Sequence, residues 1–451
     1  MDDRDQLPQL THPLPAPPHH VVIVGGGFAG LYAAKELGRA PVRVTLIDKR
    51  NFHLFQPLLY QVATGSLSPG EIAAPLRATL RDQRNTQVLM EEVTGIDAAR
   101  RRLYLANAWI EYDSLILGTG AANSYFGNPW ETVAPGLKSL EDATEMRQRI
   151  LYAFEAAEKE PDSEIRRQWL TFVIVGGGPT GVELAGALGE IANETLRRDF
   201  RLIRPQEAQI LLIDASPRIL SSYAPELSDK AERFLMKLGV RTRTGVRVTS
   251  IDEQGLSFRG PDGVSNRIAT RTVLWAAGVQ ASSFTLALAE STGARLDRAG
   301  RVQVEPDLTL KGHPEIFATG DMVTLTQDGQ PVPGVCPAAM QMGRYAARRI
   351  VDRIKADRLN GRAASSPFRY HDKGSLAVIG RAAAVAQFGA VRMAGHFAWL
   401  AWLFIHIMYL VGFQNRVLVF IQWGFQYLTF SRGARLITGV QSPPASSSKS
   451  G

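Results

Sequence analysis

The sequence predicts an α/β protein with two Rossmann-like dinucleotide-binding domains, the second inserted in the first, followed by C-terminal membrane-associating helices. Three observations predict this fold class: an internal repeat, a nucleotide-type signal that resumes after the second copy, and an apolar C-terminal stretch without acids. The 451 residues are enough for such a chain, because single hydrophobic cores stop growing near ~250–300 residues.

The internal repeat lies at Val21–Gly38 and Phe172–Gly189, where VVIVGGGFAGLYAAKELG returns as FVIVGGGPTGVELAGALG. Each copy is a β-branched apolar run, then Gly-x-Gly-x-x-Gly, then a small-residue helical pattern. This order is typical of a strand–turn–helix that holds a pyrophosphate at the helix N-terminus. Two such units indicate two dinucleotides on one chain and electrons passing between them.

Each glycine of the repeat has a predicted task. The first allows the tight turn out of the strand, the second lets the backbone approach the pyrophosphate, and the third lets the helix pack close to the strand. In order, these are Gly25, Gly27 and Gly30 in the first copy and Gly176, Gly178 and Gly181 in the second.

An acid ends the second strand of each unit, Asp48 in VRVTLID and Asp214 in QILLID. A carboxylate there accepts hydrogen bonds from the adenosine ribose hydroxyls and repels a 2′-phosphate. The alternative for Asp214 is a solvated acid at a strand end. The pattern favours NADH over NADPH, although nearby Arg218 leaves a 2′-phosphate site open.

Three later segments bring further backbone to the ligands. SLILGTG at Ser114–Gly120 and TVLWAAGV at Thr272–Val279 are buried strands that end in glycines, and they echo each other. EIFATGD at Glu315–Asp321 delivers a carboxylate suited to a flavin, with a plain turn as the alternative. Because this signal follows the second copy, insertion of that copy is the economical topology. The residues expected at the ligands are Gly120, Gly278, Gly320 and Asp321.

The predicted boundaries follow from these signals. Residues 20–160 and 300–390 form the first domain, 165–290 the inserted domain, and 391–440 the amphipathic membrane-anchoring helices. Residues 1–19 and 441–451 are expected to be flexible tails. The N-terminal tail has no apolar segment of the secretory type, so the core is expected to stay on the cytoplasmic side.

Cysteine and charge usage restrict the chemistry and the partners. Cys336 is the only cysteine, so the chain cannot relay electrons through a dithiol, and they must pass directly to a bound acceptor. The net charge is +8, and no acid follows Asp372. An anionic lipid surface explains a basic and apolar C-terminus better than nucleic acid does. The basic residues there are Lys373, Arg381, Arg392, Arg416, Arg432, Arg435 and Lys449.

The apolar C-terminus divides at GFQNR into Phe397–Phe413 and Val417–Phe430. The first is at the lower edge of the ~17–25 residues that span a bilayer, and the second is too short. A hairpin on the membrane surface is favoured over one transmembrane helix or a buried oligomer interface. The second helix carries a polar stripe of Gln422, Gln426 and Thr429, with Trp423, Phe425 and Tyr427 suited to the lipid interface. His396 and His406 are interpreted as packing residues, and no metal site is predicted.

With these motifs the chain resembles the type II NADH:quinone oxidoreductases over roughly Val21–Gly439. The resemblance rests on GGGFAG with HLFQPLLYQVATG, SYFG, GGGPTGVELAG, ATGD, AAMQMGRYAA, DKGSLAVIGRAAAV and AWLAWLFIHIMYLVGFQNR. It implies FAD in the first unit, NADH in the second, and two electrons passed to a membrane quinone without proton pumping. It also implies a peripheral homodimer on the cytoplasmic face of the cell membrane.

The resemblance further implies three residues with roles in the reaction. Glu183 matches an acid near the nicotinamide, with a helix-surface acid as the alternative. Gln341 matches the second glutamine of a quinone-side A-Q-x-x-x-Q segment, is expected to face the nucleotides, and has Pro337 where the first glutamine falls. Lys373 is expected to stabilise reduced, anionic flavin, or else to be a plain loop lysine. No nucleophile and no obligatory catalytic acid are expected.

Two rival functions share the nucleotide motifs. A soluble flavoprotein reductase that passes electrons to a protein acceptor has no use for the apolar C-terminus. A NADH-sensing flavoprotein, whose reduced state controls an interaction, would use the same sites without turnover. Membrane association distinguishes the first rival, and quinone-dependent consumption of NADH distinguishes the second.

Overall fold

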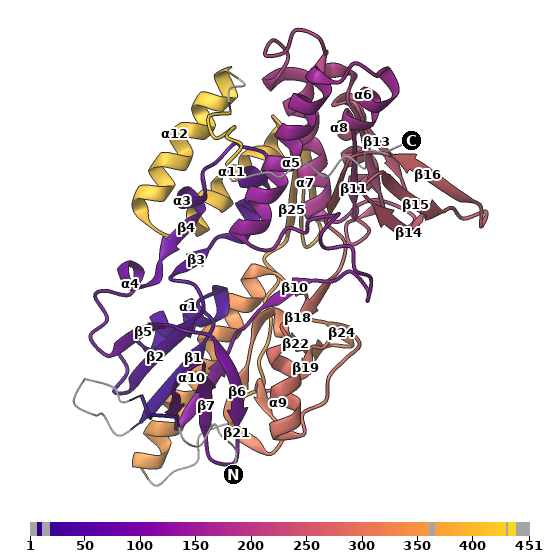
Figure 1. Cartoon of the computed structure of the whole chain (residues 1–451). Coiled ribbons are helices and arrows are strands. Elements are labelled where there is room, and N and C mark those ends of the chain that lie inside the picture. Colours follow the sequence, from indigo (N-terminus) through magenta and orange to yellow (C-terminus); the bar gives the residue numbers. More distant parts are fainter. Residues whose placement is uncertain (1–6, 11–18, 360–365, 430–431, 439–451) are drawn as a thin grey trace.

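The structure is a computed structural model that describes residues 7–10, 19–359, 366–429 and 432–438 (Figure 1). Most of the two predicted tails lies outside these residues. The expected flexible tail is wrong for residues 7–10, because Trp109 Nε1 donates to the Leu7 carbonyl at 2.8 Å and the Leu10 amide donates to the Trp109 carbonyl at 2.8 Å. This short segment therefore runs along β8 (Trp109–Glu111).

The first unit is built on a six-stranded sheet in the order β20-β21-β9-β1-β2-β5. All neighbouring strands are parallel except β20 and β21. Helices cover the sheet, so its central strands are continuous apolar runs rather than alternating ones. Because β21 follows the second unit in sequence but pairs with β9, the second unit is inserted, as predicted. The strands are β1 (His20–Val24), β2 (Arg43–Asp48), β5 (Thr86–Met90), β9 (Ser114–Leu117), β20 (Thr309–Leu310) and β21 (His313–Ala318).

The inserted unit repeats this plan on a parallel four-stranded sheet in the order β13-β12-β11-β17. Each unit also carries a three-stranded antiparallel side sheet, so the repeat extends well beyond the glycine motif. The main strands are β11 (Thr171–Val175), β12 (Gln209–Ile213), β13 (Val240–Arg243) and β17 (Thr272–Trp275). The side sheets are β6 (Val93–Asp97), β7 (Arg102–Leu105) and β8 in the first unit, and β14 (Arg247–Asp252), β15 (Gly255–Arg259) and β16 (Ser265–Ala269) in the second.

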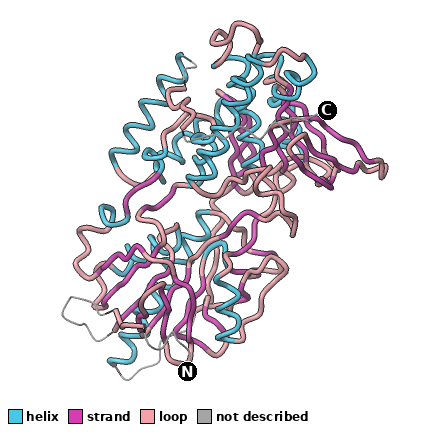
Figure 2. Tube along the Cα trace, viewed as in Figure 1, coloured by secondary structure: helices cyan, strands magenta, loops and turns pink. Residues whose placement is uncertain are grey.

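Two antiparallel strands join the units, and Figure 2 shows the separate groups of strands on either side of them. These are β10 (Ala121–Asn123) and β18 (Val279–Ala281), which pair with each other. Each follows the glycine-ended strand of its own unit. The two chain segments that cross between the units therefore lie side by side, and the glycines that follow β9 and β17 face the same region.

Helices pack closely on these sheets where glycine permits it. In the first unit, α1 (Phe28–Leu37) crosses α10 (Cys336–Arg358) at Gly343, where a Cβ atom would lie 2.0 Å from the Ala29 carbonyl oxygen. The second unit carries α7 (Pro179–Glu190) and α8 (Pro225–Lys237). Between the units, α5 (Leu140–Lys159) begins at Ser139 with a capping box to Asp142, a motif that satisfies the free amides of a first turn.

The remaining short elements lie in the connections. They are β3 (Phe52–Leu54), η2 (Gln56–Leu58), α2 (Leu59–Ala63), α3 (Pro69–Ile72), β4 (Ala73–Pro75), α4 (Leu76–Thr79), α6 (Ser163–Trp169), the π-helix η3 (Ile191–Thr195), η4 (Pro205–Glu207), α9 (Phe284–Thr292), β19 (Val302–Gln303), η5 (Gly320–Met322), β22 (Val323–Thr324), β23 (Thr326–Gln327) and β24 (Gln330–Pro331).

The C-terminal part is a three-stranded antiparallel sheet followed by the helical hairpin α11 (His396–Tyr409) and α12 (Phe413–Thr429). The strands are β25 (Ser375–Gly380), β26 (Ala383–Phe388) and β27 (Val391–Gly395). Helix α7 packs on β25 so closely that a Cβ atom on Gly186 would lie 1.7 Å from the Ile379 carbonyl oxygen. In Figure 1 the yellow α12 lies beside α3, which it contacts.

The α12 helix turns Gln422 and Gln426 of the predicted polar stripe inward, whereas Thr429 is exposed and much of the apolar side faces outward. Phe420, Ile421, Phe425 and Leu428 are 58%, 61%, 59% and 77% exposed. The Gln426 amide instead donates to the Ser66 carbonyl at 2.5 Å. No helix among the described residues is long and apolar enough to cross a membrane.

One aromatic residue of α12 contradicts its expected place at the lipid interface. Trp423 is buried and donates from Nε1 to Gln61 Oε1 at 2.8 Å. It therefore belongs to the inward side of the helix, one position from the polar Gln422, while Phe425 faces outward. Helical periodicity alone does not show which face of α12 points inward, because both faces carry aromatic residues.

Part of the basic C-terminus is neutralised by acids of the inserted unit. Arg432 is buried and pairs with Glu190 at 2.8 Å, and Arg435 pairs with Asp199. Arg392 pairs with Glu226 at the start of α8. These arginines attach the C-terminal part to the inserted unit. The anionic lipid surface that was expected to explain the basic C-terminus is therefore not needed to account for these three.

Candidate functional site

A large cavity lies where the first unit, the inserted unit and the helical hairpin meet. Its volume is about 1710 Å³, above the ~300–1,000 Å³ of a site for one drug-sized ligand, so there is room for more than one ligand. The first unit contributes its glycine loop and strand ends, the inserted unit the first turns of α7, and the hairpin one side of α11. Representative lining residues are Gly25, Gly27, Asp48, Pro179, Glu183 and His406.

The two glycine motifs have the same backbone geometry. Gly25 and Gly176 adopt positive φ angles of 99° and 115°, where a side chain is strained. A Cβ atom on Gly30 would lie 1.8 Å from the Gly25 carbonyl oxygen, and one on Gly181 would lie 1.8 Å from that of Gly176. The third glycine therefore lets the helix start close against the turn.

The second glycine of each motif faces open space. A Cβ atom on Gly27 or Gly178 would meet nothing within 4 Å. Gly25 and Gly27 line the cavity, whereas Gly30, Gly176, Gly178 and Gly181 do not. The open approach expected for a pyrophosphate therefore exists in both copies, but only the first opens onto the cavity.

The strand-end acids are also held alike. Asp48 Oδ2 accepts from the Gly26 amide at 2.5 Å, and Asp214 Oδ2 accepts from the Gly177 amide at 2.5 Å. Burial raises the pKa of Asp48 above its ordinary value, against the opposing effect of that amide. Asp48 lines the cavity and Asp214 does not.

Arg218 is already engaged by its own unit. Its guanidinium donates to the Tyr223 carbonyl at 2.7 Å, to Ser228 Oγ at 2.6 Å and to the Ser221 carbonyl at 2.8 Å. A guanidinium has five N–H groups in a rigid fork, and these contacts direct the fork at the loop before α8. The structure therefore gives no support to a 2′-phosphate site at Arg218.

The other predicted ligand-binding positions divide between the cavity and its surroundings. Gly120, Gly320 and Asp321 line the cavity, and both glycines have positive φ angles, 69° and 73°. Gly278 does not line it. At Gly278, where φ is 76°, a Cβ atom would lie 2.6 Å from Phe126 Cζ, so this glycine allows close packing of SYFG against the inserted unit.

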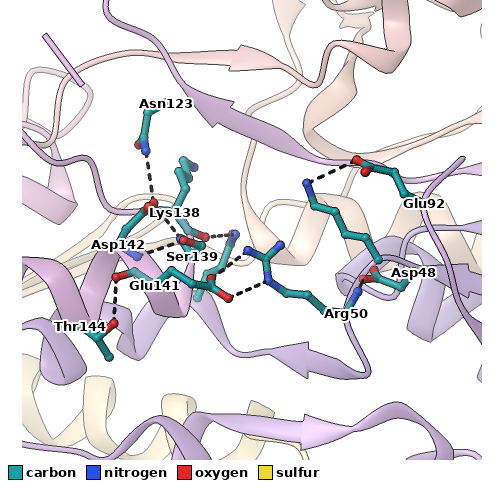
Figure 3. Close-up of polar contacts among 11 residues, drawn as sticks. Asp48, Arg50, Glu92, Asn123, Lys138, Ser139, Glu141, Asp142 and Thr144 are labelled. Carbon is teal, nitrogen blue, oxygen red and sulfur yellow. Dashed lines mark hydrogen bonds and ion pairs between the residues drawn. The ribbon is translucent and has the colours of Figure 1, made fainter. Parts of the chain in front are cut away.

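A polar cluster closes one side of the cavity, between the end of β2 and the start of α5 (Figure 3). Arg50 donates to both oxygens of Glu141, from Nη2 at 2.8 Å and from Nε at 3.4 Å. This hydrogen bond lowers the pKa of Glu141. Asp142 accepts from Asn123 Nδ2 and from the amides of Lys138 and Ser139. The cluster ties the first unit to the helix between the units.

Glu183 is a half-buried carboxyl group on α7 that lines the cavity. Burial raises its pKa to about 8, and a long hydrogen bond from the Val378 amide at 3.5 Å opposes this only weakly. The group is therefore mostly protonated at neutral pH. The alternative of a helix-surface acid is wrong, because such an acid would be solvated.

Lys373, which was expected beside the reduced flavin, lines the cavity, whereas Gln341, which was expected on the quinone side, does not. The Gln341 amide instead forms two hydrogen bonds with the backbone of His371, each 2.9 Å long. The expectation that Gln341 faces the nucleotides is therefore wrong. Its amide holds the segment that leads to Lys373.

Sequence reasoning missed several polar residues of the cavity. Tyr60 and Tyr223 are both buried lining residues, and burial raises the pKa of each. His406 was interpreted as a packing residue but also lines the cavity. Burial lowers its pKa to about 4. For Tyr60 the sequence signal was its place within HLFQPLLYQVATG, next to the first cofactor loop.

The single thiol belongs to the same cavity. Cys336 begins α10 and lines the cavity, and burial raises its pKa to about 12, so it is a neutral thiol. Among the described residues, no group of three or more His, Cys, Asp or Glu side chains could hold a metal ion.

Comparisons with known proteins agree with this arrangement. Residues 19–343 match the family model for pyridine nucleotide-disulphide oxidoreductases, and residues 372–432 match the NDH2 C-terminal domain. The fold and the paired nucleotide units thus define a pyridine nucleotide-disulphide oxidoreductase. The fold is similar to that of NDH2 from Plasmodium falciparum in complex with NADH, with a TM-score of 0.84, 19% identity and coverage of 93% of this chain and 100% of that one.

Two sequence relatives narrow the class. The type II NADH:quinone oxidoreductases NdhA and Ndh of Mycobacterium tuberculosis are 48% and 46% identical to this chain. The matches cover 93% and 95% of this chain and 89% and 93% of those proteins. The chain belongs to the type II NADH:quinone oxidoreductases. The predicted family, fold class and enzyme class are confirmed.

Proposed function

We propose that this protein binds FAD in the first unit, oxidises NADH bound at the inserted unit, and reduces a membrane quinone that enters beside the hairpin, without pumping protons. The observation that carries this proposal is the single cavity lined by all three parts. Donor, cofactor and acceptor must come within contact of one another for direct electron transfer. A shared cavity allows this without a dithiol relay, and Cys336 is the only cysteine.

The first unit fits FAD. Gly27 leaves open space at the start of α1 where a pyrophosphate can approach the backbone, and a helix N-terminus favours an anion. Asp48 is placed for the adenosine ribose, and Gly120, Gly320 and Asp321 line the same cavity further along. When bound, the flavin accepts a hydride and passes two electrons to the acceptor.

The inserted unit fits NADH at its second glycine motif. Gly178 leaves open space at the start of α7, and Asp214 directly follows β12 with its carboxylate beside the motif. Gly176 and Gly181 shape that turn, and Gly278 supports the neighbouring strand end. Pro179, Thr180 and Glu183 carry α7 into the cavity, so a nicotinamide held here would reach the flavin side.

Side chains of the cavity supply orientation and charge. Glu183, mostly neutral at pH 7, can lie beside a nicotinamide without placing a charge there. Lys373 offers a positive charge to reduced, anionic flavin, and Gln341 positions the segment that carries it. Because this charge would stabilise the reduced flavin, Lys373→Ala should slow flavin reduction by NADH more than reoxidation by the quinone, and stopped-flow measurement of both half-reactions checks this.

We also propose that the outer face of α12 lies on an anionic lipid surface and that the protein is peripheral, on the cytoplasmic side. The exposed Phe420, Ile421, Phe425 and Leu428 support this, because contiguous exposed apolar side chains mark interaction sites. The homodimer stays a prediction. Ile421→Glu should release the protein from anionic liposomes in a flotation assay. Leu202→Glu is the matched control, since Leu202 is 73% exposed but lies on the inserted unit.

Truncation is a poorer test of membrane association. Removing residues from Gly395 onward would delete α11, whose Ile405, His406 and Tyr409 line the cavity. Such a protein would lose cavity walls together with its outer apolar face. Single outward substitutions separate the two roles.

The proposed activity is tested by steady-state oxidation of NADH and NADPH by the FAD-loaded protein, with ubiquinone and menaquinone analogues as acceptors. The proposal requires rapid NADH turnover with at least one quinone and much weaker turnover with NADPH. Turnover with protein acceptors but not with quinones would instead indicate a soluble reductase, and reduction without turnover would indicate a sensor.

A further inference from the structure

A chain of buried hydrogen bonds connects the membrane-facing hairpin to the cavity. Trp423 on α12 donates from Nε1 to Gln61 Oε1 at 2.8 Å. Gln61 on α2 donates from Nε2 to the Tyr60 hydroxyl at 2.9 Å. All three side chains are buried, with exposed fractions of 8%, 7% and 7%, and Tyr60 lines the cavity.

The direction of this chain is fixed by chemistry. An indole N–H can only donate, so the oxygen of the Gln61 amide must face Trp423. The amide nitrogen must then face Tyr60, which removes the usual ambiguity between the two ends of a glutamine. The Tyr60 oxygen accepts that hydrogen bond, and its own proton remains for another acceptor. Among the residues that the structure describes, Gln61 is the only hydrogen-bond partner of the Tyr60 hydroxyl.

We propose that Tyr60 donates this proton in a hydrogen bond to a carbonyl oxygen of the bound quinone, and that Gln61 and Trp423 are positioning residues that aim it. The inference rests on the proposed function and names a binding group for its acceptor. A quinone carbonyl only accepts hydrogen bonds, which matches a hydroxyl that has only a donor left. Burial raises the pKa of Tyr60, so the phenol keeps its proton.

The chain also explains why a helix of the apolar hairpin carries an inward tryptophan. Removing the indole N–H would free the Gln61 amide to rotate and to present its oxygen to Tyr60. The phenol would then donate to Gln61 instead of to the cavity. The position of α12 therefore determines whether the Tyr60 hydroxyl donates its hydrogen bond to the cavity or to Gln61.

The test uses the FAD-loaded full-length protein and a short-chain menaquinone analogue. Tyr60→Phe keeps the ring and removes the donor, and should lower kcat/KM for the quinone about tenfold, the effect of one buried hydrogen bond. Trp423→Phe should lower it by a smaller factor. Because both variants break the same chain, the double variant should be no worse than Tyr60→Phe alone.

Controls separate this role from packing. Tyr112→Phe removes a buried hydroxyl that has no partner among the described residues and lies outside the cavity. Trp402→Phe removes an indole of the same hairpin whose ring centre lies 5.0 Å from that of Trp423, with the planes tilted by 35°. In the described part of the chain, its Nε1 also has no partner. Both should keep the quinone kcat/KM near that of the wild type. The infrared carbonyl band of bound quinone should shift in Tyr60→Phe and not in Tyr112→Phe.

The possible outcomes are distinct. Wild-type quinone kinetics in Tyr60→Phe would overturn the assignment while leaving the proposed function intact. Additive losses in the double variant would overturn the positioning roles of Gln61 and Trp423. Failure of the wild-type protein to reduce any quinone would instead overturn the proposed function itself.

Discussion

The two copies of the nucleotide unit have the same backbone geometry but meet the cavity differently. In the first copy the glycine loop, the strand-end Asp48 and the glycine-ended strand all line it. In the second copy the first turns of α7, the loop before α8 and Gln280 of β18 do so, whereas the glycine motif and Asp214 lie outside. The difference teaches that two copies of one motif with the same backbone geometry can meet a cavity in different ways, which supports the proposal of an enclosed cofactor site in the first and a more open substrate site in the second.

The copies also diverge at one position of the helix after the glycines. Tyr32 in the first copy corresponds to Glu183 in the second. Tyr32 stands beside Arg344 on α10, with the guanidinium 4.7 Å from the ring centre. Glu183 is a half-buried acid that lines the cavity, and its pKa is raised. The two copies therefore differ in side-chain chemistry at a position that the glycine motif leaves free.

The largest effect is expected from the third glycine of each motif. Gly30→Ala and Gly181→Ala both place a Cβ atom 1.8 Å from a backbone oxygen, an overpacking that costs about 3 kcal/mol. Gly30→Ala should weaken FAD retention about a hundredfold, seen as lost flavin absorbance after gel filtration. Gly181→Ala should keep its FAD but be reduced slowly by NADH. Loss of FAD from both variants would contradict the proposal that the first copy binds FAD and the second binds NADH.

A pH-dependent effect is expected from Glu183. Its pKa is about 8 in the folded protein, against an ordinary value of 4.5 for a solvated glutamate, so between these values the folded state holds a proton that the unfolded state has lost. The free energy of unfolding should therefore fall by about 1.4 kcal/mol per pH unit as pH rises through that window. Glu183→Gln removes this pH dependence. The free energy of unfolding of the variant, relative to that of the wild type, should therefore increase between pH 4.5 and 8. Urea unfolding of both proteins across this window measures it, and a constant difference would contradict the raised pKa.

A smaller effect is expected from the two strand-end acids. Asp214→Ala should reduce the preference for NADH over NADPH about tenfold, since it removes a charge that repels the 2′-phosphate and accepts from the ribose. Asp48→Ala should leave that ratio unchanged and weaken FAD binding instead. The ratio of kcat/KM for the two nucleotides checks both. An altered ratio in Asp48→Ala would place NADH at the first unit.

The smallest effect is expected from the Arg50–Glu141 pair, which has no described counterpart at Asp214. Their side chains are 34% and 64% exposed, and such ion pairs contribute about 0–1 kcal/mol. Arg50→Ala should speed FAD dissociation by about fivefold or less, and added salt should reduce the difference from the wild type. FAD release followed by fluorescence measures this. A dissociation rate equal to that of the wild type at low salt would show that the pair does not help to retain FAD.

The sequence predicts local backbone features well and the facing of side chains poorly. The glycine spacing, the β-branched runs and the strand-end acids each follow from steric rules within one segment, and the structure places them as expected. The inward side of α12 could not be predicted, because its hydropathy stripe is the same whether the polar face meets protein or water. The partner was Ser66, far away in sequence.

The same limit explains the remaining errors at the site. Gln341 lies on the predicted helix, but its orientation depends on a loop that returns with His371. Arg432 looked like a surface charge, and only the tertiary fold brings Glu190 to it. The hydrogen-bond chain to Tyr60 also depends on a distant element, because α12 supplies the Trp423 that lies behind it. Long-range contacts therefore decide which members of a recognised motif face the ligand.

The central claim is that NADH gives its electrons to a flavin held by the first unit and that a quinone removes them through the same cavity. The most direct measurement is sequential-mixing stopped flow of the FAD-loaded protein, first with NADH and then with a menaquinone analogue, without oxygen. The account predicts that NADH bleaches the flavin absorbance and that the quinone restores it, each step at least as fast as steady-state turnover. A flavin that NADH reduces but that no quinone reoxidises would contradict it.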